Sequence, residues 1–216
     1  MIITSYGHAL FTVETAGGFT MATDPYNESV GYPLPKLSCD WVTVSHHHHD
    51  HDNVALFAET PYVIEGAGAV SPVEGVTVFG FPSFHDDAQG QKRGNNTMFL
   101  TEADGLRVLH MGDLGHLLTE EEVNRFGRVD VLMIPVGGFY TIGAAEAVRL
   151  YHMIRPRIVI PMHYKTKWSA GMPIALVEDF IHEIGMAPSR QNLLRITKED
   201  IGEAPRLVVL TPQVTE

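Results

Sequence analysis

The sequence predicts a mixed α/β fold in which β-sheets pack on one another and helices cover the outside. The first half of the chain consists of short β-prone runs, and the second half alternates strands with amphipathic helices. Gly and Pro recur at short intervals, and no linker, repeat or charge block separates one part from another. We therefore expect a single domain over residues 1–216, a length that can bury a sizeable core.

Strands account for most of the first half. Two neighbouring pairs of runs are joined by hairpin signals, Ala16-Gly17-Gly18 and Ala103-Asp104-Gly105. A short helix is expected at 53–59, and the segment 26–39 is expected to be a loop because it is rich in Gly, Pro and Asn. The expected strands are 2–6, 10–15, 19–23, 41–45, 62–65, 73–84, 96–101 and 106–112.

Helices appear in the second half. A helix over 119–126 opens with Thr119 followed three residues later by Glu122, the spacing of a capping box. Apolar residues at helical spacing predict two more helices, at 144–154 and 174–184. The strands expected between and after them are 130–136, 157–161, 193–196 and 206–210.

The composition excludes several classes of protein. A single cysteine, Cys39, excludes a disulfide framework, a four-cysteine zinc module and a cysteine-held iron–sulfur cluster. The net charge of −11 argues against a general nucleic-acid binder or a polybasic membrane binder. No apolar run approaches the ~18 residues of a membrane span, and residues 1–11 lack the basic region of a secretory leader. We expect no membrane span and a cytoplasmic location.

Four consecutive histidines follow the predicted strand 41–45 directly. With the two aspartates after them, they contain the pattern His46-x-His48-x-Asp50-His51. Side chains two residues apart on an extended segment point the same way, so His46 and His48 can share one metal ion. Asp50 and His51, after a bend, can serve a second ion close by. The intervening residues are themselves His47 and His49, which leaves this register to be tested.

Three further candidate ligands come where predicted strands end, namely His85, Asp113 and His163. Imidazole and carboxylate groups suit Zn, Mn or Fe, and an incomplete protein shell leaves positions open for water. A carboxylate such as Asp113 can bridge two ions. His110 is the alternative to His85, but it falls inside a predicted strand, as a core histidine would.

The candidate ligands occur in a characteristic order. From the N-terminus this order is Asp24, His46-x-His48-x-Asp50-His51, His85, Asp113 and His163. It resembles the five motifs of the metallo-β-lactamase superfamily, over nearly the whole chain. The phrases most similar to its small bacterial group related to ascorbate-phosphate lactonase include Gly7-His8-Ala9, Thr23-Asp24-Pro25, Gly112-Asp113-Leu114-Gly115-His116 and Ile160-Pro161-Met162-His163-Tyr164. Ser45 departs from the pattern, since Thr is common there.

This resemblance implies a four-layer αββα sandwich with a binuclear site at one edge. The first ion would be held by His46, His48 and His85, and the second by Asp50, His51 and His163. Asp113 would bridge the two divalent ions, zinc in the first place, with Mn or Fe as alternatives. The implied activity is hydrolysis of a small ester, lactone or phosphodiester by a metal-bound hydroxide, with Asp50 and Asp113 as catalytic groups.

Other residues are candidates for supporting roles. His8 and Asp24 are expected to hydrogen-bond ligand imidazoles from behind. Arg93 and Lys165 are close in sequence to proposed ligands and can bind an anionic substrate group, although surface ion pairing explains them equally well. Tyr140 can donate a hydrogen bond to a leaving group, or simply pack in a loop.

Two functions remain as alternatives to the hydrolase. A non-catalytic metal-binding protein would use the histidine run alone, so that Asp113 and His163 would not affect metal content. A nuclease of the same superfamily shares the ligand order, but the charge of −11 counts against it. The expected partner is a small-molecule substrate, anionic or neutral, and homo-oligomerisation is left open.

Overall fold

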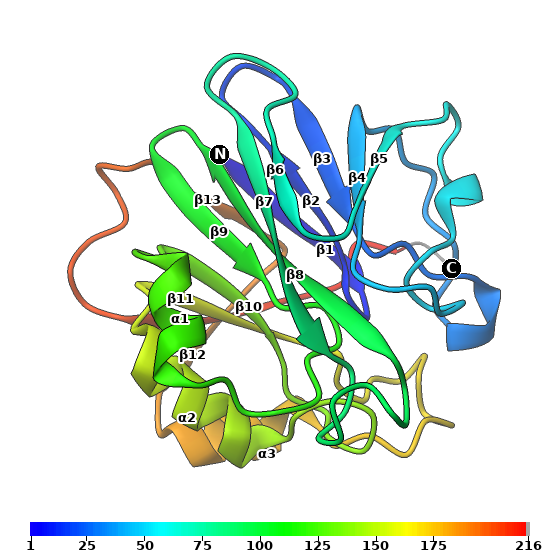
Figure 1. The fold of residues 1–216 in the computed structure, drawn as a ribbon, viewed down its shortest axis with the longest axis vertical. Coiled ribbons are helices and arrows are strands. Elements are labelled where there is room, and N and C mark those ends of the chain that lie inside the picture. The colour runs from blue at the N-terminus through cyan, green and yellow to red at the C-terminus, as the bar shows by residue number, and fades with distance from the viewer. Residues whose placement is uncertain (215–216) are drawn as a thin grey trace.

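The computed structural model describes residues 1–214, and two β-sheets packed face to face form its centre (Figure 1). The last two residues of the predicted domain, 215–216, lie outside the described residues. The smaller sheet has the strand order β13 (Leu193–Arg195), β1 (Ile2–Gly7), β2 (Leu10–Glu14), β3 (Thr20–Thr23), β4 (Trp41–Val44) and β5 (Tyr62–Glu65).

One edge strand of the larger sheet follows the last helix of the chain, and the other edge strand lies in the first half of the chain. The order of this sheet is β12 (Pro188–Gln191), β14 (Arg206–Leu210), β11 (Ile158–Met162), β10 (Val131–Pro135), β9 (Leu106–His110), β8 (Asn95–Ala103), β7 (Thr77–Phe84) and β6 (Gly68–Val70). The strands from β9 to β12 in this order are parallel, whereas β6, β7, β8 and β9 pair antiparallel.

Alternating side chains of the central strand β10 divide the core into two layers. Val131 and Met133 pack between the two sheets, against Ile3 and Phe11 of the smaller sheet. The intervening side chains point to the other face, where three helices lie together (Figure 1). These helices are α1 (Glu120–Phe126), α2 (Ala144–Ile154) and α3 (Val177–Ile184). Because both faces of the strand are covered, its five residues are all buried, as expected for a parallel strand.

The outer face of the smaller sheet is covered by irregular chain. Tyr26, Tyr32 and Phe57 pack there on Leu10 and Val42. Two single-turn 3₁₀ helices belong to this layer, η1 (Glu28–Val30) and η2 (Val54–Leu56). The predicted α/β fold of packed sheets with outer helices is confirmed. Among residues 1–214, no helix is both long enough and apolar enough to cross a bilayer.

Most predicted elements are confirmed, including the helix 144–154 and the capping box between Thr119 and Glu122. The helix expected at 53–59 is wrong beyond one 3₁₀ turn, because Ala58 donates its N–H to Leu37 O in the neighbouring loop. The helix expected from 174 begins at Val177, since Ala175 N–H bonds to Gly137 O and holds that segment extended. The edge strands β6 and β12 are not among the predicted elements, because their residues lack an apolar alternation.

The strand arrangement brings several chain segments to one edge of the sandwich. The carboxyl ends of β4, β9 and β11 are followed by His46, Asp113 and His163, and β7 is followed by His85. Parallel neighbours such as β9, β10 and β11 end at the same edge, which is where ligands commonly bind in such sheets. The turn between β1 and β2 adds His8 to this edge.

Candidate metal centre

Histidine and aspartate side chains from five chain segments meet at this edge. They form three overlapping groups, within each of which the potential ligand atoms lie within 4.8 Å of one another. The groups are His46, His48 and His85; His8, Asp50, His51 and His163; and His46, His51 and Asp113. All seven residues named as metal ligands from the sequence are thus in one cluster, and His8 is also part of it.

Asp113 lies at the centre of the cluster. Its Oδ2 is 3.2 Å from His51 Nε2, 3.3 Å from His85 Nε2 and 3.3 Å from His163 Nε2. Burial alone would raise the pKa of Asp113, but His163 and His51 hold it well below its usual range, so the carboxylate is ionised. The turn is fixed by Asn96, whose Oδ1 accepts the Asp113 N–H at 2.9 Å.

Gly112, just before Asp113, is required by the close packing of this turn. Its φ of 55° lies in the left-handed region. A Cβ at this position would also collide with Asn96 and Ser45. A residue other than glycine could therefore occupy position 112 only if the turn that carries Asp113 rearranged.

A buried carboxylate, Asp24, orients two of the histidines. Its Oδ2 accepts bonds from His51 Nδ1 at 2.9 Å and from the Ser45 hydroxyl at 2.6 Å, and Ser45 Oγ lies 2.9 Å from His46 Nδ1. In the tautomers that satisfy these bonds, both imidazoles carry their proton on Nδ1. The Nε2 lone pairs of His46 and His51 are then free to bind a cation, as in many carboxylate–histidine–metal arrangements.

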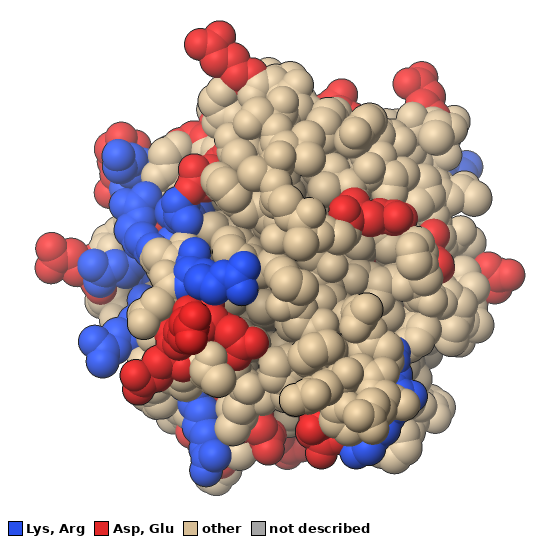
Figure 2. All heavy atoms as spheres, in the orientation of Figure 1, with Lys and Arg blue, Asp and Glu red and all other residues tan. Residues whose placement is uncertain are grey.

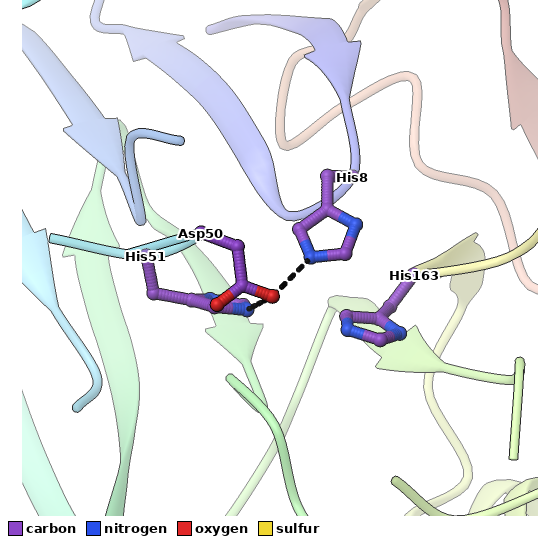
Figure 3. Close-up of side chains that lie close together, drawn as sticks. All are labelled: His8, Asp50, His51 and His163. Atoms are coloured by element: carbon purple, nitrogen blue, oxygen red, sulfur yellow. Dashed lines mark hydrogen bonds and ion pairs between the residues drawn. The ribbon is translucent and has the colours of Figure 1, made fainter. Parts of the chain in front are cut away.

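The side chain of His8 contacts a carboxylate of the cluster, whereas the sequence predicted that it would hydrogen-bond a ligand imidazole (Figure 3). His8 Nε2–H donates to Asp50 Oδ2 at 3.2 Å, and the His8 ring centroid lies 4.1 Å from that of His163. The His163 backbone N–H also donates to His8 O at 3.0 Å. His8, Asp24 and His163 all have positive φ angles, of 53°, 40° and 52°. Such strained backbone is concentrated at functional sites because the surrounding structure must hold it.

The donor set fits divalent metal ions. His46 Nε2, His51 Nε2 and His163 Nε2 are buried and have no hydrogen-bond partner among residues 1–214, and neither has Asp113 Oδ1. An unpartnered buried polar atom costs about 1–3 kcal/mol, so a cluster of them requires compensation. Converging imidazole nitrogens beside a carboxylate are the ligands that zinc and similar ions prefer.

The other histidines of this region lie apart from the cluster. His110 Nε2 is 3.0 Å from Ala9 O, and its Nδ1 accepts the Gly112 N–H, so both ring nitrogens are satisfied. His47 and His49 are exposed, and His47 lies near Asp52 and Glu65. The register His46-x-His48 thus places the alternate histidines outside, although the segment is bent and not a regular strand.

An open cleft of about 390 Å³ leads to the cluster. Its lining includes His48, Asp50, His85 and Asp113, together with Arg93 and Tyr140. Lys165 does not line this cleft, and its backbone N–H bonds to Ala175 O. Two supporting residues were not predicted from the sequence. Asn96 accepts the Asp113 N–H, and Asp86, a buried carboxylate next to His85, accepts N–H groups of the loop that follows. The glycines at 90 and 94 after Asp86 were the only signal for such a loop.

Known proteins resemble this chain in sequence and in fold. A family model described as a beta-lactamase superfamily domain matches residues 2–163. The chain belongs to the metallo-β-lactamase superfamily. A zinc-dependent hydrolase of this superfamily from Thermotoga maritima has a structure with a TM-score of 0.79 and 36% sequence identity, covering 97% of each chain.

Two further relatives agree with this assignment. A metal-dependent hydrolase from Opitutus terrae is 31% identical over 77% of this chain and 86% of its own. A metallo hydrolase from Ignicoccus hospitalis is 23% identical with a TM-score of 0.69, over 98% of this chain and 95% of its own, and shows the fold alone. The predicted superfamily is confirmed, and the chain is a hydrolase of the metal-dependent class.

Proposed function

We propose that this chain is a binuclear metal-dependent hydrolase of a small ester, lactone or phosphodiester. The observation that carries the proposal is the position of Asp113, whose Oδ2 lies within 3.3 Å of His51, His85 and His163. One carboxylate in contact with both groups of histidines is suited to hold two ions together. His46, His48 and His85 would bind one ion, and Asp50, His51 and His163 the other.

Two divalent ions, zinc in the first place and Mn or Fe as alternatives, would polarise the substrate and lower the pKa of attacking water. The protein contributes orientation and charge. Asp24 fixes the tautomers of His46 and His51, so that the correct nitrogen faces the centre. Asp50 lines the cleft, where its carboxylate would accept a proton. His8 holds that carboxylate through its Nε2–H.

The surface offers little support for a nucleic-acid substrate. On the face that Figure 2 shows, basic side chains gather mainly at the left, with a smaller group at the lower right, and acidic side chains lie near both, so no broad basic surface is visible on this face. The net charge is −11. Nucleases need a basic surface to hold the phosphate backbone, so a small substrate is favoured over RNA or DNA.

Metal content and hydrolysis together test this proposal. The protein would be loaded with zinc or manganese, its metal measured by mass spectrometry, and its activity assayed on esters, lactones and phosphodiesters. We expect about two ions per chain and, for Asp113→Ala, loss of both ions and at least ~100-fold lower activity. Less than one ion per chain, with no hydrolysis under either metal, would contradict the proposal. Full metal content without hydrolysis, unaffected by Asp113→Ala, would favour a metal-binding protein that uses the histidine run alone.

A further inference from the structure

The loop that follows His85 is built around a buried carboxylate. Asp86 Oδ1 accepts the backbone N–H groups of Ala88 and Gly90, and its Oδ2 accepts those of Lys92 and Arg93, at 2.7–2.9 Å. One side chain therefore fixes the backbone of Arg93 relative to the neighbouring His85.

The Arg93 side chain is held in place by two residues of another loop, Phe139 and Tyr140. Its Nη2 donates to Phe139 O at 3.0 Å, and its guanidinium carbon lies 5.8 Å from the centre of the Tyr140 ring. Arg93 and Tyr140 line the same cleft as His85 and Asp113. Phe139 has a φ of 60°, so the carbonyl that receives Arg93 belongs to a strained turn.

Arg93 has no acidic partner among the residues that the structure describes. Among residues 1–214, no carboxylate oxygen lies within 4.0 Å of its guanidinium, whereas the adjacent Lys92 pairs with Asp87 at 2.6 Å. Arg190 is likewise paired, with Glu178 at 3.1 Å. In a chain with 26 acidic residues against 15 basic ones, a half-buried arginine that is ordered but unpaired is available for an anionic ligand.

We propose that Arg93 binds an anionic group, a carboxylate or phosphate, that the substrate carries in addition to the bond being hydrolysed. The guanidinium fork matches two oxygens of such a group, and its contacts with Phe139 and Tyr140 reduce the freedom lost on binding. The proposal rests on the proposed hydrolase function of the adjacent centre. It narrows the substrate class to anionic esters, lactones or diesters, with Arg93 as the specificity-determining residue.

Matched substrates test this assignment. The zinc-loaded protein would be assayed with mono-4-nitrophenyl glutarate and with its methyl ester, which differ in one carboxylate. A phosphonate analogue of the same chain length distinguishes phosphate from carboxylate recognition. We expect the wild type to favour an anionic ester over the methyl ester by about 10–100-fold in kcat/KM. Arg93→Gln should abolish most of this preference, Arg93→Lys should retain part of it, and Lys92→Gln should preserve it.

Equilibrium binding separates this proposal from the hydrolase function. Calorimetry with glutarate and with a short alkyl phosphonate would compare zinc-loaded wild type, Arg93→Gln and Lys92→Gln, with melting temperatures checking that each variant is folded. We expect about tenfold or greater loss of affinity in Arg93→Gln alone. Equal affinity of Arg93→Gln and wild type for both anions, or equal rates on charged and methyl esters, would overturn the role of Arg93. Absence of hydrolysis of every ester, with anion binding dependent on Arg93, would overturn the hydrolase and not the anion site.

Discussion

The two groups of candidate metal ligands differ in how firmly their surroundings hold them. In the His51 group, defined as Asp50, His51 and His163, each residue is braced: His51 by Asp24, Asp50 by the His8 side chain, and His163 through its backbone to His8. In the His46 group, defined as His46, His48 and His85, the side chain of His46 is braced through Ser45, and His85 is held through its backbone N–H, which donates to Gly94 O at 3.0 Å. His48 is half-buried. Among residues 1–214, the Nδ1 atoms of His85 and His163 both lack a hydrogen-bond partner, so the groups differ in side-chain bracing: two braced side chains in the His51 group and one in the His46 group.

The two groups should therefore differ in metal affinity. Ligands that are already oriented lose less freedom when they bind, and the partners behind them typically change metal affinity by 10–100-fold. The His51 group should therefore bind its ion more tightly than the His46 group. Two residues of the His46 group, His48 and His85, line the open cleft, whereas Asp50 is the member of the His51 group that does, so an ion held by the His46 group would exchange more easily with solvent.

The largest effect is expected from Asp24→Ala, which removes the carboxylate behind both groups. Asp24 is fully buried and accepts bonds from His51, from the Ser45 hydroxyl and from the Ser45 N–H at 2.8 Å. Its loss leaves buried donors unsatisfied, so the free energy of unfolding should fall by about 3 kcal/mol. Both ions should also be bound more weakly. Urea unfolding of the metal-free protein and metal analysis measure the two effects, and an unchanged unfolding midpoint would contradict this role.

Stepwise removal of metal tests the contrast between the groups directly. Dialysis of the two-ion protein against increasing chelator should release the ions in two steps, separated by about tenfold or more in affinity. His48→Ala should abolish the step at low chelator, whereas His163→Ala should abolish the step at high chelator. A single step in the wild type, or loss of the same step in both variants, would show that the bracing residues do not distinguish the positions.

A substitution at His8 should lower the metal affinity of only one release step, the one at high chelator. His8→Ala removes the bond to Asp50 Oδ2 without removing a proposed ligand, so the affinity of that step should fall by about 10–100-fold. His110→Ala is the matched control, since His110 is also buried but its nitrogens bond to Ala9 and Gly112. That control should lower stability without moving either chelation step. Equal shifts in both variants would mean that His8 acts only through folding.

The proposed ligands could be predicted from the sequence because they follow apolar runs that become strands. Asp113 and His163 need only the rule that the carboxyl ends of parallel strands in one sheet meet at the same edge, whereas His46 follows β4 of the other sheet and reaches them through the packing of the two sheets. The His8–Asp50 bond could not be predicted in this way. It joins residues 42 positions apart and depends on the left-handed backbone of the turn after β1.

Supporting residues were harder to predict because their partners are set by the local course of the backbone. Asp86 bonds to N–H groups of its own loop, a pattern that residue type alone does not reveal. Lys165 is two residues from His163 in sequence, yet the pairing of this segment with Leu176 places it away from the lining of the cleft. Nearness in sequence therefore identified Arg93 as a cleft residue but not Lys165.

The smallest effect is expected from Ser45→Ala, which tests the support of the His46 group. The Ser45 hydroxyl accepts from His46 Nδ1 and donates to Asp24, so its loss removes the one side-chain brace that residues 1–214 provide for the His46 group. His51 keeps its own bond to Asp24, so the tighter chelation step should remain unchanged. The weaker step should shift by about tenfold, and the free energy of unfolding should fall by about 1 kcal/mol. A shift of the tighter step instead would mean that Ser45 acts mainly on Asp24, and that the two groups share one support.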